Sequence, residues 1–125
     1  MLGALLAIPA IGMAAEFHVT SPTIKDQSTI GSEHVFNGFG CTGQNVSPAL
    51  QWDHAPKDTK SFAVTVYDPD APTGSGWWHW TVYNIPAEIT SLKEGENFKP
   101  FKKDDKTITF GKVGQGRTDF GSSVY

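Results

Sequence analysis

The chain has 125 residues, which is the size of one small domain. Hydrophobic residues make up 38% and charged residues 18%, a composition too apolar for a disordered chain and too mixed for a membrane bundle. The net charge of −3 argues against a nucleic-acid partner, and the single cysteine excludes both an internal disulfide and a cysteine-rich zinc module.

An apolar segment opens the chain. Residues 1–14 carry no charge, and Pro9 interrupts them. The run is shorter than the ~20 residues that span a bilayer, so no integral membrane span is expected, and Gly12 and Ala14 have the small-x-small spacing that signal peptidase reads. We expect a signal peptide over residues 1–14, a domain over residues 15–125, and a periplasmic or secreted location. The usual Lys or Arg before the run is missing, and an apolar first strand or helix is the alternative.

The remainder alternates short apolar runs with clusters of Gly, Pro, Asp and Asn. Such punctuation is typical of strands joined by turns, and no window shows a helical repeat. The sequence predicts one all-β domain, a sandwich or a barrel. Strands are expected over residues 17–20, 49–52, 61–67, 79–85 and 107–110, with a Gly-rich loop over residues 37–43.

Two of these runs make more specific predictions. The 61–67 run is apolar almost throughout, which predicts a strand buried on both faces. In the 79–85 run, the alternation that starts at Trp80 and Val82 continues to either Asn84 or Ile85. Trp52 is expected in the core.

Side chains that can carry out chemistry gather after the 61–67 run. Asp68 and Asp70 lie in an Asp-Pro-Asp-Ala-Pro bend that ends at Pro72, and His79 opens the next strand. Each proline fixes its own φ and biases the preceding residue toward an extended conformation. The bend is therefore stiff, as a preorganised site requires. An ordinary structural turn requires the same stiffness, so both interpretations stand at this point.

These residues suit a small anion. A protonated His79 attracts a phosphate-like group, strand-end N–H groups add donors, and a carboxylate accepting the other ring N–H would orient the imidazole. The second carboxylate could receive the ammonium of a zwitterion such as phosphoethanolamine. The apolar walls would come from Trp77, Trp78 and Trp80.

Two alternatives use the same residues. Asp68, Asp70 and His79 could ligate a metal ion, or they could form the acid and base of a hydrolase or metal-assisted enzyme. The sequence offers no second His or Glu at ligand spacing nearby and no nucleophile motif, which weighs against both alternatives.

Several motifs resemble the phosphatidylethanolamine-binding protein family, whose bacterial members are called Raf-kinase-inhibitor-like proteins. The strongest match covers the Asp-Pro-Asp-Ala-Pro bend, the Trp-His-Trp run over residues 78–80 and residues 81–86. Further matches lie over residues 39–41, 45–48, 50–52, 60–63 and 115–121, and the stretch over residues 93–112 shows none. The leading apolar segment is similar to that of the exported bacterial branch.

The resemblance implies an antiparallel two-sheet β-sandwich with an anion-binding pocket at one end. It also implies a binding or inhibitory module for a small anion or phospholipid headgroup, with a kinase or protease as possible target, without catalytic turnover and without a cofactor. Asp68, Asp70, Pro72 and His79 match the first half of the family's pocket. The oligomeric state is not predicted.

The resemblance weakens after Gly121. The family's second signature, a Pro-Pro-rich segment followed by a His and a Tyr, does not match residues 122–125, so we expect a domain that is incomplete at its C-terminus. The partner Cys of exported members belongs to that signature. The resemblance therefore implies that Cys41 is a free thiol; a buried small residue is the alternative.

Overall fold

The computed structural model describes residues 15–96 and 112–125. The expected signal peptide over residues 1–14 and the expected strand over residues 107–110 lie outside these residues. None of the described residues belongs to a helix that is long and apolar enough to cross a membrane. The strands are β1 (His18–Thr20), β2 (Asn37–Gly38), β3 (Cys41–Thr42), β4 (Leu50–Asp53), β5 (Ser61–Asp68), β6 (Trp77–Pro86), β7 (Ser91–Leu92) and β8 (Gly114–Gln115).

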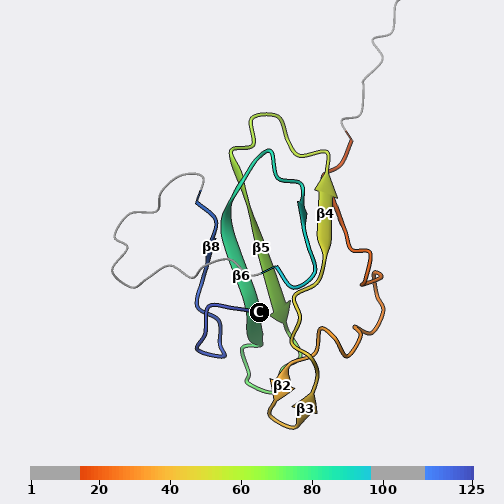
Figure 1. Cartoon of the computed structure of the whole chain (residues 1–125), viewed down its shortest axis with the longest axis vertical. Coiled ribbons are helices and arrows are strands. Elements are labelled where there is room, and N and C mark those ends of the chain that lie inside the picture. The colour runs from red at the N-terminus through yellow and green to blue at the C-terminus, as the bar shows by residue number, and fades with distance from the viewer. Residues whose placement is uncertain (1–14, 97–111) are drawn as a thin grey trace, which may run out of the picture.

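These strands form two three-stranded sheets and a separate hairpin. One sheet has the order β1-β4-β7, the other has the order β5-β6-β8, and β2 pairs with β3. Every pairing is antiparallel. Figure 1 shows β5 and β6 as the long central pair, with β4 beside them and the β2–β3 hairpin at one end. The predicted all-β, antiparallel two-sheet architecture is confirmed.

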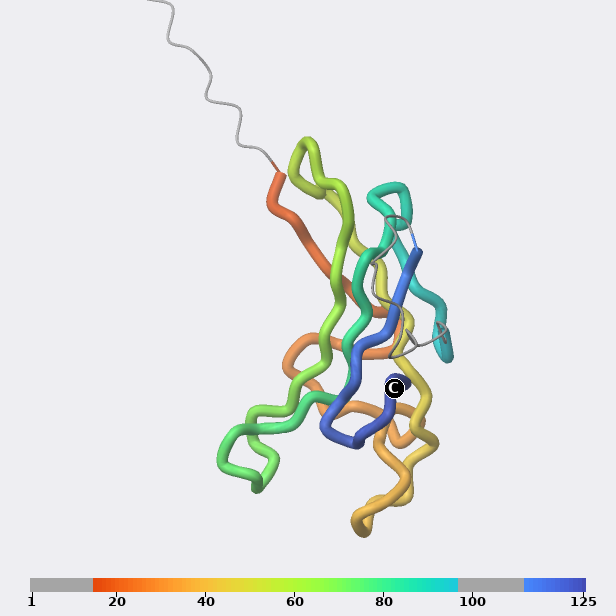
Figure 2. The backbone as a smooth tube through the Cα atoms, turned by 90° about the vertical axis from the view of Figure 1, so that its left-hand side faces the viewer, coloured from red at the N-terminus to blue at the C-terminus, as the bar shows by residue number. Residues whose placement is uncertain are grey.

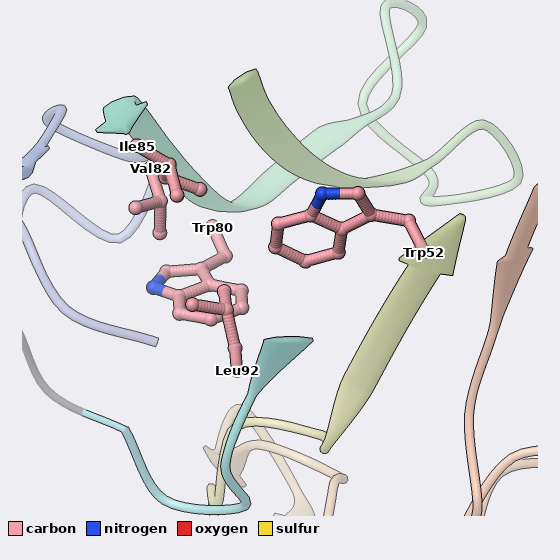
Figure 3. Close-up of a cluster of buried hydrophobic side chains, with 5 residues drawn as sticks. All are labelled: Trp52, Trp80, Val82, Ile85 and Leu92. Carbon is pink, nitrogen blue, oxygen red and sulfur yellow. The ribbon is translucent and has the colours of Figure 1, made fainter. Parts of the chain in front are cut away.

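The core lies between the two sheets. Trp80, Val82 and Ile85 of β6 are fully buried, and Trp52 of β4 and Leu92 of β7 pack against them from the other sheet (Figure 3). Burial of apolar surface stabilises the fold by about 25 cal/mol per Å². Two large indoles therefore supply much of the attraction between the sheets, and the expected core position of Trp52 is confirmed.

The prediction that the 61–67 run is buried on both faces is wrong. Phe62, Val64 and Val66 face the core and are half-buried, whereas Ala63 and Thr65 are exposed. A strand is covered on both faces where other layers flank the sheet, as in parallel sheets, but here β5 belongs to an antiparallel sheet with one covered face. Among the described residues, β5 is also one of the two edge strands of its sheet.

A β-bulge decides which residue continues the inward face of β6. Phe62 pairs with Ile85 and Val64 pairs with Val82. β6 therefore contains one residue more than β5 in the stretch between these two pairs. Asn84 lies within it and has a φ of 61°, a left-handed conformation that Asn tolerates better than most residues. Ile85 therefore faces the core, while the Asn84 side chain donates a hydrogen bond to the Lys112 carbonyl at 2.9 Å.

The sequence predicts a Gly-rich loop over residues 37–43. In the structure this segment is instead the β2–β3 hairpin. Asn37 pairs with Thr42 and Gly38 pairs with Cys41. The two residues at the tip, Phe39 and Gly40, both have positive φ, at 51° and 89°. Positive φ at both central residues is the requirement of a two-residue type I′ turn, whose twist matches that of the strands.

Candidate functional site

Three chain segments meet at one end of the sandwich. They are the β2–β3 hairpin, the bend between β5 and β6, and the turn over residues 117–122, which Figure 2 shows at the same end of the molecule. Together they line a cavity of about 440 Å³ that is open to solvent. Its lining consists of Phe36, Gly38, Phe39, Cys41, Asp68, Ala71, Pro72, Thr73, Trp77, His79 and Phe120.

Three of the four predicted site residues line this cavity. Asp68, Pro72 and His79 contribute to its wall, whereas Asp70 is exposed and does not. Asp68 Oδ1 accepts a hydrogen bond from the Asp70 backbone N–H at 2.9 Å. This Asx-type turn bends the chain directly after β5. Asp68 therefore both shapes the bend and contributes to the cavity wall.

The bend is held by further hydrogen bonds. The Thr73 hydroxyl donates to the Gly76 carbonyl at 2.6 Å, and the Tyr67 hydroxyl donates to the Ser75 carbonyl at 2.7 Å. Gly76 has a φ of 72°, and a Cβ there would collide with the Tyr67 hydroxyl. The stiffness expected from the prolines is thus reinforced by side-chain contacts.

His79 owes its position to a second bulge in β6. Val66 pairs with Trp80 and the next residue of β5, Tyr67, pairs with Trp78, so His79 is the extra residue. Trp80 consequently points into the core, while Trp78 packs against Tyr67 at the exposed face, with ring centroids 4.5 Å apart and the rings tilted by 37°. Bulges commonly redirect a side chain next to a functional site, and this one leaves His79 at the cavity wall.

The carboxylate expected to orient His79 makes no hydrogen bond or ion pair with it. No hydrogen bond or ion pair joins the His79 ring to Asp68 or Asp70, all three of which are described. One oxygen of Asp68 is instead engaged in the bend. The ring of Phe120 is the neighbour of the imidazole, at a centroid distance of 5.1 Å and an interplanar angle of 68°.

Aromatic rings form most of the cavity wall. Phe36 stacks on Phe120 with centroids 4.0 Å apart, and Trp77 meets Phe120 edge-on at 5.4 Å. Phe39, which is 84% exposed, completes this group above Trp77. Trp77, Trp78 and Trp80 are the predicted walls, but only Trp77 lines the cavity. The bulge at His79 leaves Trp80 in the core and Trp78 on the opposite, exposed face.

The local sequence pattern does not assign Phe36, Phe39 and Phe120 to the site. Phe36 precedes the hairpin, Phe39 lies at its tip, and Phe120 lies in the matching 115–121 segment. No spacing rule joins these segments to the acidic bend. The available signal was that both segments belong to the resemblance.

Cys41 also lines the cavity and is an exposed free thiol. The alternative interpretation of a buried small residue is therefore wrong. No group of three or more His, Cys, Asp and Glu side chains in the described part of the chain is arranged to hold a metal ion.

Comparison with known proteins gives a consistent result. Residues 20–125 match the family model described as phosphatidylethanolamine-binding protein. The UPF0098 protein YbcL of Escherichia coli (strain K12) is 56% identical over 108 residues, which cover 86% of this chain and 56% of YbcL. The UPF0098 protein YbhB of the same strain is 48% identical over 105 residues, which cover 84% of this chain and 63% of YbhB.

A solved structure agrees with these relatives. The crystal structure of E. coli YbcL, described as a new member of the mammalian PEBP family, has a TM-score of 0.75 and 54% sequence identity. The match covers 89% of this chain and 65% of that one, so this chain spans less than two thirds of the length of the relatives it matches. The family model, which matches residues 20–125, shows that the chain belongs to the phosphatidylethanolamine-binding protein family.

Proposed function

We propose that the chain is a non-enzymatic binding module for a small anion or a phosphorylated headgroup. The observation that carries this proposal is the cavity of about 440 Å³ in which His79 and Asp68 share a wall with aromatic rings. Membership of a family of binding proteins supports a module of this type.

The chemistry of the lining supports a ligand with two polar ends. A protonated His79 donates to a phosphate oxygen, because both ring nitrogens of an imidazolium are donors. Asp68 would repel a bare phosphate but attract an ammonium group on the same ligand. Phe36, Phe39 and Trp77 offer ring faces to a cation and apolar surface to the carbons between the two charges.

A titration tests this proposal. Inorganic phosphate and phosphoethanolamine are added while tryptophan fluorescence is followed, since Trp77 lies in the cavity wall. We expect a saturable change with both ligands that is lost in His79→Ala. His54→Ala is the matched control, because His54 is exposed and pairs with Asp53 away from the cavity. No saturable change, or an equal change in His79→Ala, contradicts the proposal.

The role of Asp68 requires a comparison of the two ligands. Asp68→Asn keeps an oxygen that can accept the hydrogen bond from Asp70 and removes the charge. We expect it to bind phosphoethanolamine less tightly while phosphate binding is unchanged or improved. Equal weakening of both ligands would mean that Asp68 serves the bend alone.

We further propose that the protein is exported to the periplasm or secreted and that a kinase or protease is its protein target. Mass spectrometry of the periplasmic fraction after expression tests the first point, and the expected mature chain begins after Ala14 or Ala15. Inhibition assays on purified kinases and proteases, with His79→Ala as the comparison, test the second. Absence of turnover on a phosphoester is the expected result for a binding module.

A further inference from the structure

We propose that Asp119, which lies outside the cavity lining, is the residue that positions both His79 and Phe120 at the cavity. Asp119 Oδ2 accepts a hydrogen bond from the Trp78 backbone N–H at 2.7 Å, and the Asp119 N–H donates to the Trp78 carbonyl at 3.2 Å. One residue thus binds both backbone groups of Trp78. Its two contacts act on the residue directly before His79.

Trp78 is the place where such a restraint matters. His79 is the extra residue of a bulge, and a bulge interrupts the regular ladder of hydrogen bonds. Along this edge of β6, β8 pairs Gly114 with Tyr83 and Gln115 with Val82. The Asp119 contacts extend this edge to the bulge, where the carboxylate accepts the bond from the Trp78 N–H.

The same contacts place Phe120. Phe120 follows Asp119 in the chain, and its ring lies 5.1 Å from the His79 ring and 4.0 Å from the Phe36 ring. A tight turn holds this segment, because the Thr118 N–H donates to the Ser122 carbonyl at 2.8 Å and the Gly121 N–H donates to the Thr118 carbonyl at 2.9 Å. If Asp119 released Trp78, the Phe120 wall and the imidazole would lose their common anchor.

Asp119 acts through geometry rather than through charge. Its residue is exposed, so water and salt screen the carboxylate. An aspartate that acted by charge would oppose an anion in the cavity, and its neutralisation would strengthen anion binding. A positioning role predicts the opposite for any variant that loses the hydrogen bond, and it predicts rescue by a neutral side chain that keeps the acceptor oxygen.

The test rests on the proposed function for one of its two measurements. The first is the dissociation constant for inorganic phosphate, and the second is the NMR signal of the His79 ring in the ligand-free chain, which senses the nearby Phe120 ring. We expect Asp119→Ala to weaken phosphate binding by roughly tenfold or more and to move the His79 signal. Asp119→Asn should preserve both, and Asp26→Ala, which removes an exposed charge elsewhere, should change neither.

The outcomes separate the two hypotheses. Tighter phosphate binding in both Asp119→Ala and Asp119→Asn would overturn the proposal in favour of a charge effect. An unmoved His79 signal in Asp119→Ala would also overturn it. If wild-type chain does not bind phosphate, the proposed function fails, but the His79 signal still decides the positioning role. If Asp119→Ala does not fold, Asp119→Glu replaces it, because the longer side chain keeps the charge and displaces the acceptor oxygen. Asp119→Glu should then move the His79 signal more than Asp119→Asn does. A larger shift in Asp119→Asn than in Asp119→Glu would refute the positioning role.

Discussion

The hydrogen bond between Trp80 and Gln115 allows a quantitative test of the core. The Trp80 indole N–H donates to Gln115 Oε1 at 2.5 Å, and both residues are almost completely inaccessible, at 0% and 2% exposure. This contact joins β6 to β8 inside the sandwich. Gln115→Leu keeps a similar volume but leaves a buried indole N–H without this acceptor.

The expected cost follows from that loss. A buried donor left unsatisfied costs about 1–3 kcal/mol, whereas replacement of both partners by apolar groups can be nearly neutral for the hydrogen bond itself. We therefore expect Gln115→Leu to lower the free energy of unfolding by about 1–3 kcal/mol. Trp80→Phe loses packing as well, by less than the ~3–5 kcal/mol typical of truncation of a buried Trp to Ala. The double variant should lose less than the sum of the two.

Urea unfolding followed by circular dichroism measures all four proteins of this cycle. We expect a coupling energy of about 0.5–3 kcal/mol, which is the range for residues in direct contact. Gln51→Leu on β4 is the control, since Gln51 is exposed and its replacement should change stability by less than about 0.5 kcal/mol. Additivity within about 0.3 kcal/mol would refute the argument that this bond stabilises the core.

Three further predictions concern other parts of the fold. Gly76→Ala should lower both thermal stability and phosphate affinity, because the added Cβ would collide with Tyr67. Gly74→Ala, at a similar positive φ of 80° but in open space, should lower thermal stability alone. Equal phosphate affinities of the two variants would contradict the role of the bend. Burial raises the pKa of Tyr125 from 10 in the unfolded chain to about 12. The stability that depends on its protonated hydroxyl is therefore complete below pH 10 and is lost as the pH rises from 10 to about 12. Urea unfolding midpoints measured across this range should fall in the wild type and fall less in Tyr125→Phe. At concentrations at which light scattering detects self-association of the wild type, Thr65→Lys on the edge strand β5 should reduce it, because a charged edge strand resists pairing with another chain; unchanged scattering would show that this edge is not the contact.

The strands that the sequence predicts are those with a clear pattern of their own. β1, β4, β5 and β6 carry apolar residues at strand spacing between turn residues, and the structure contains all four with boundaries that differ from the expected ones by at most two residues. β7 and β8 have two residues each, and β2 and β3 were expected as loop. Such short strands have no period to detect and exist because a neighbouring strand supplies hydrogen-bond partners, which is a tertiary property.

The predictable part of the site has a simple origin in topology. β5 and β6 are adjacent antiparallel strands, so the end of one and the start of the other must meet. This brings Asp68, Pro72 and His79 to one cavity. Phe36 and Phe120 arrive from segments that are distant in the chain, and their stacking depends on how those segments pack. Local pattern therefore predicts the polar residues of the site better than its aromatic wall.

The two bulges explain the remaining differences between sequence pattern and structure. Regular alternation along β6 would place Trp78, Trp80 and Val82 on one face, yet the bulge at His79 turns Trp78 outward. Pairing with β5 fixes this shift, because Val66 must face the core and Tyr67 must not. A bulge adds one residue to one strand only, so its position follows from the partner strand and not from the sequence of the bulged strand alone. The bulge thus directs His79 to the cavity, whereas regular alternation would assign it to a face of the sheet. The same bulge creates the backbone site at Trp78 to which Asp119 binds.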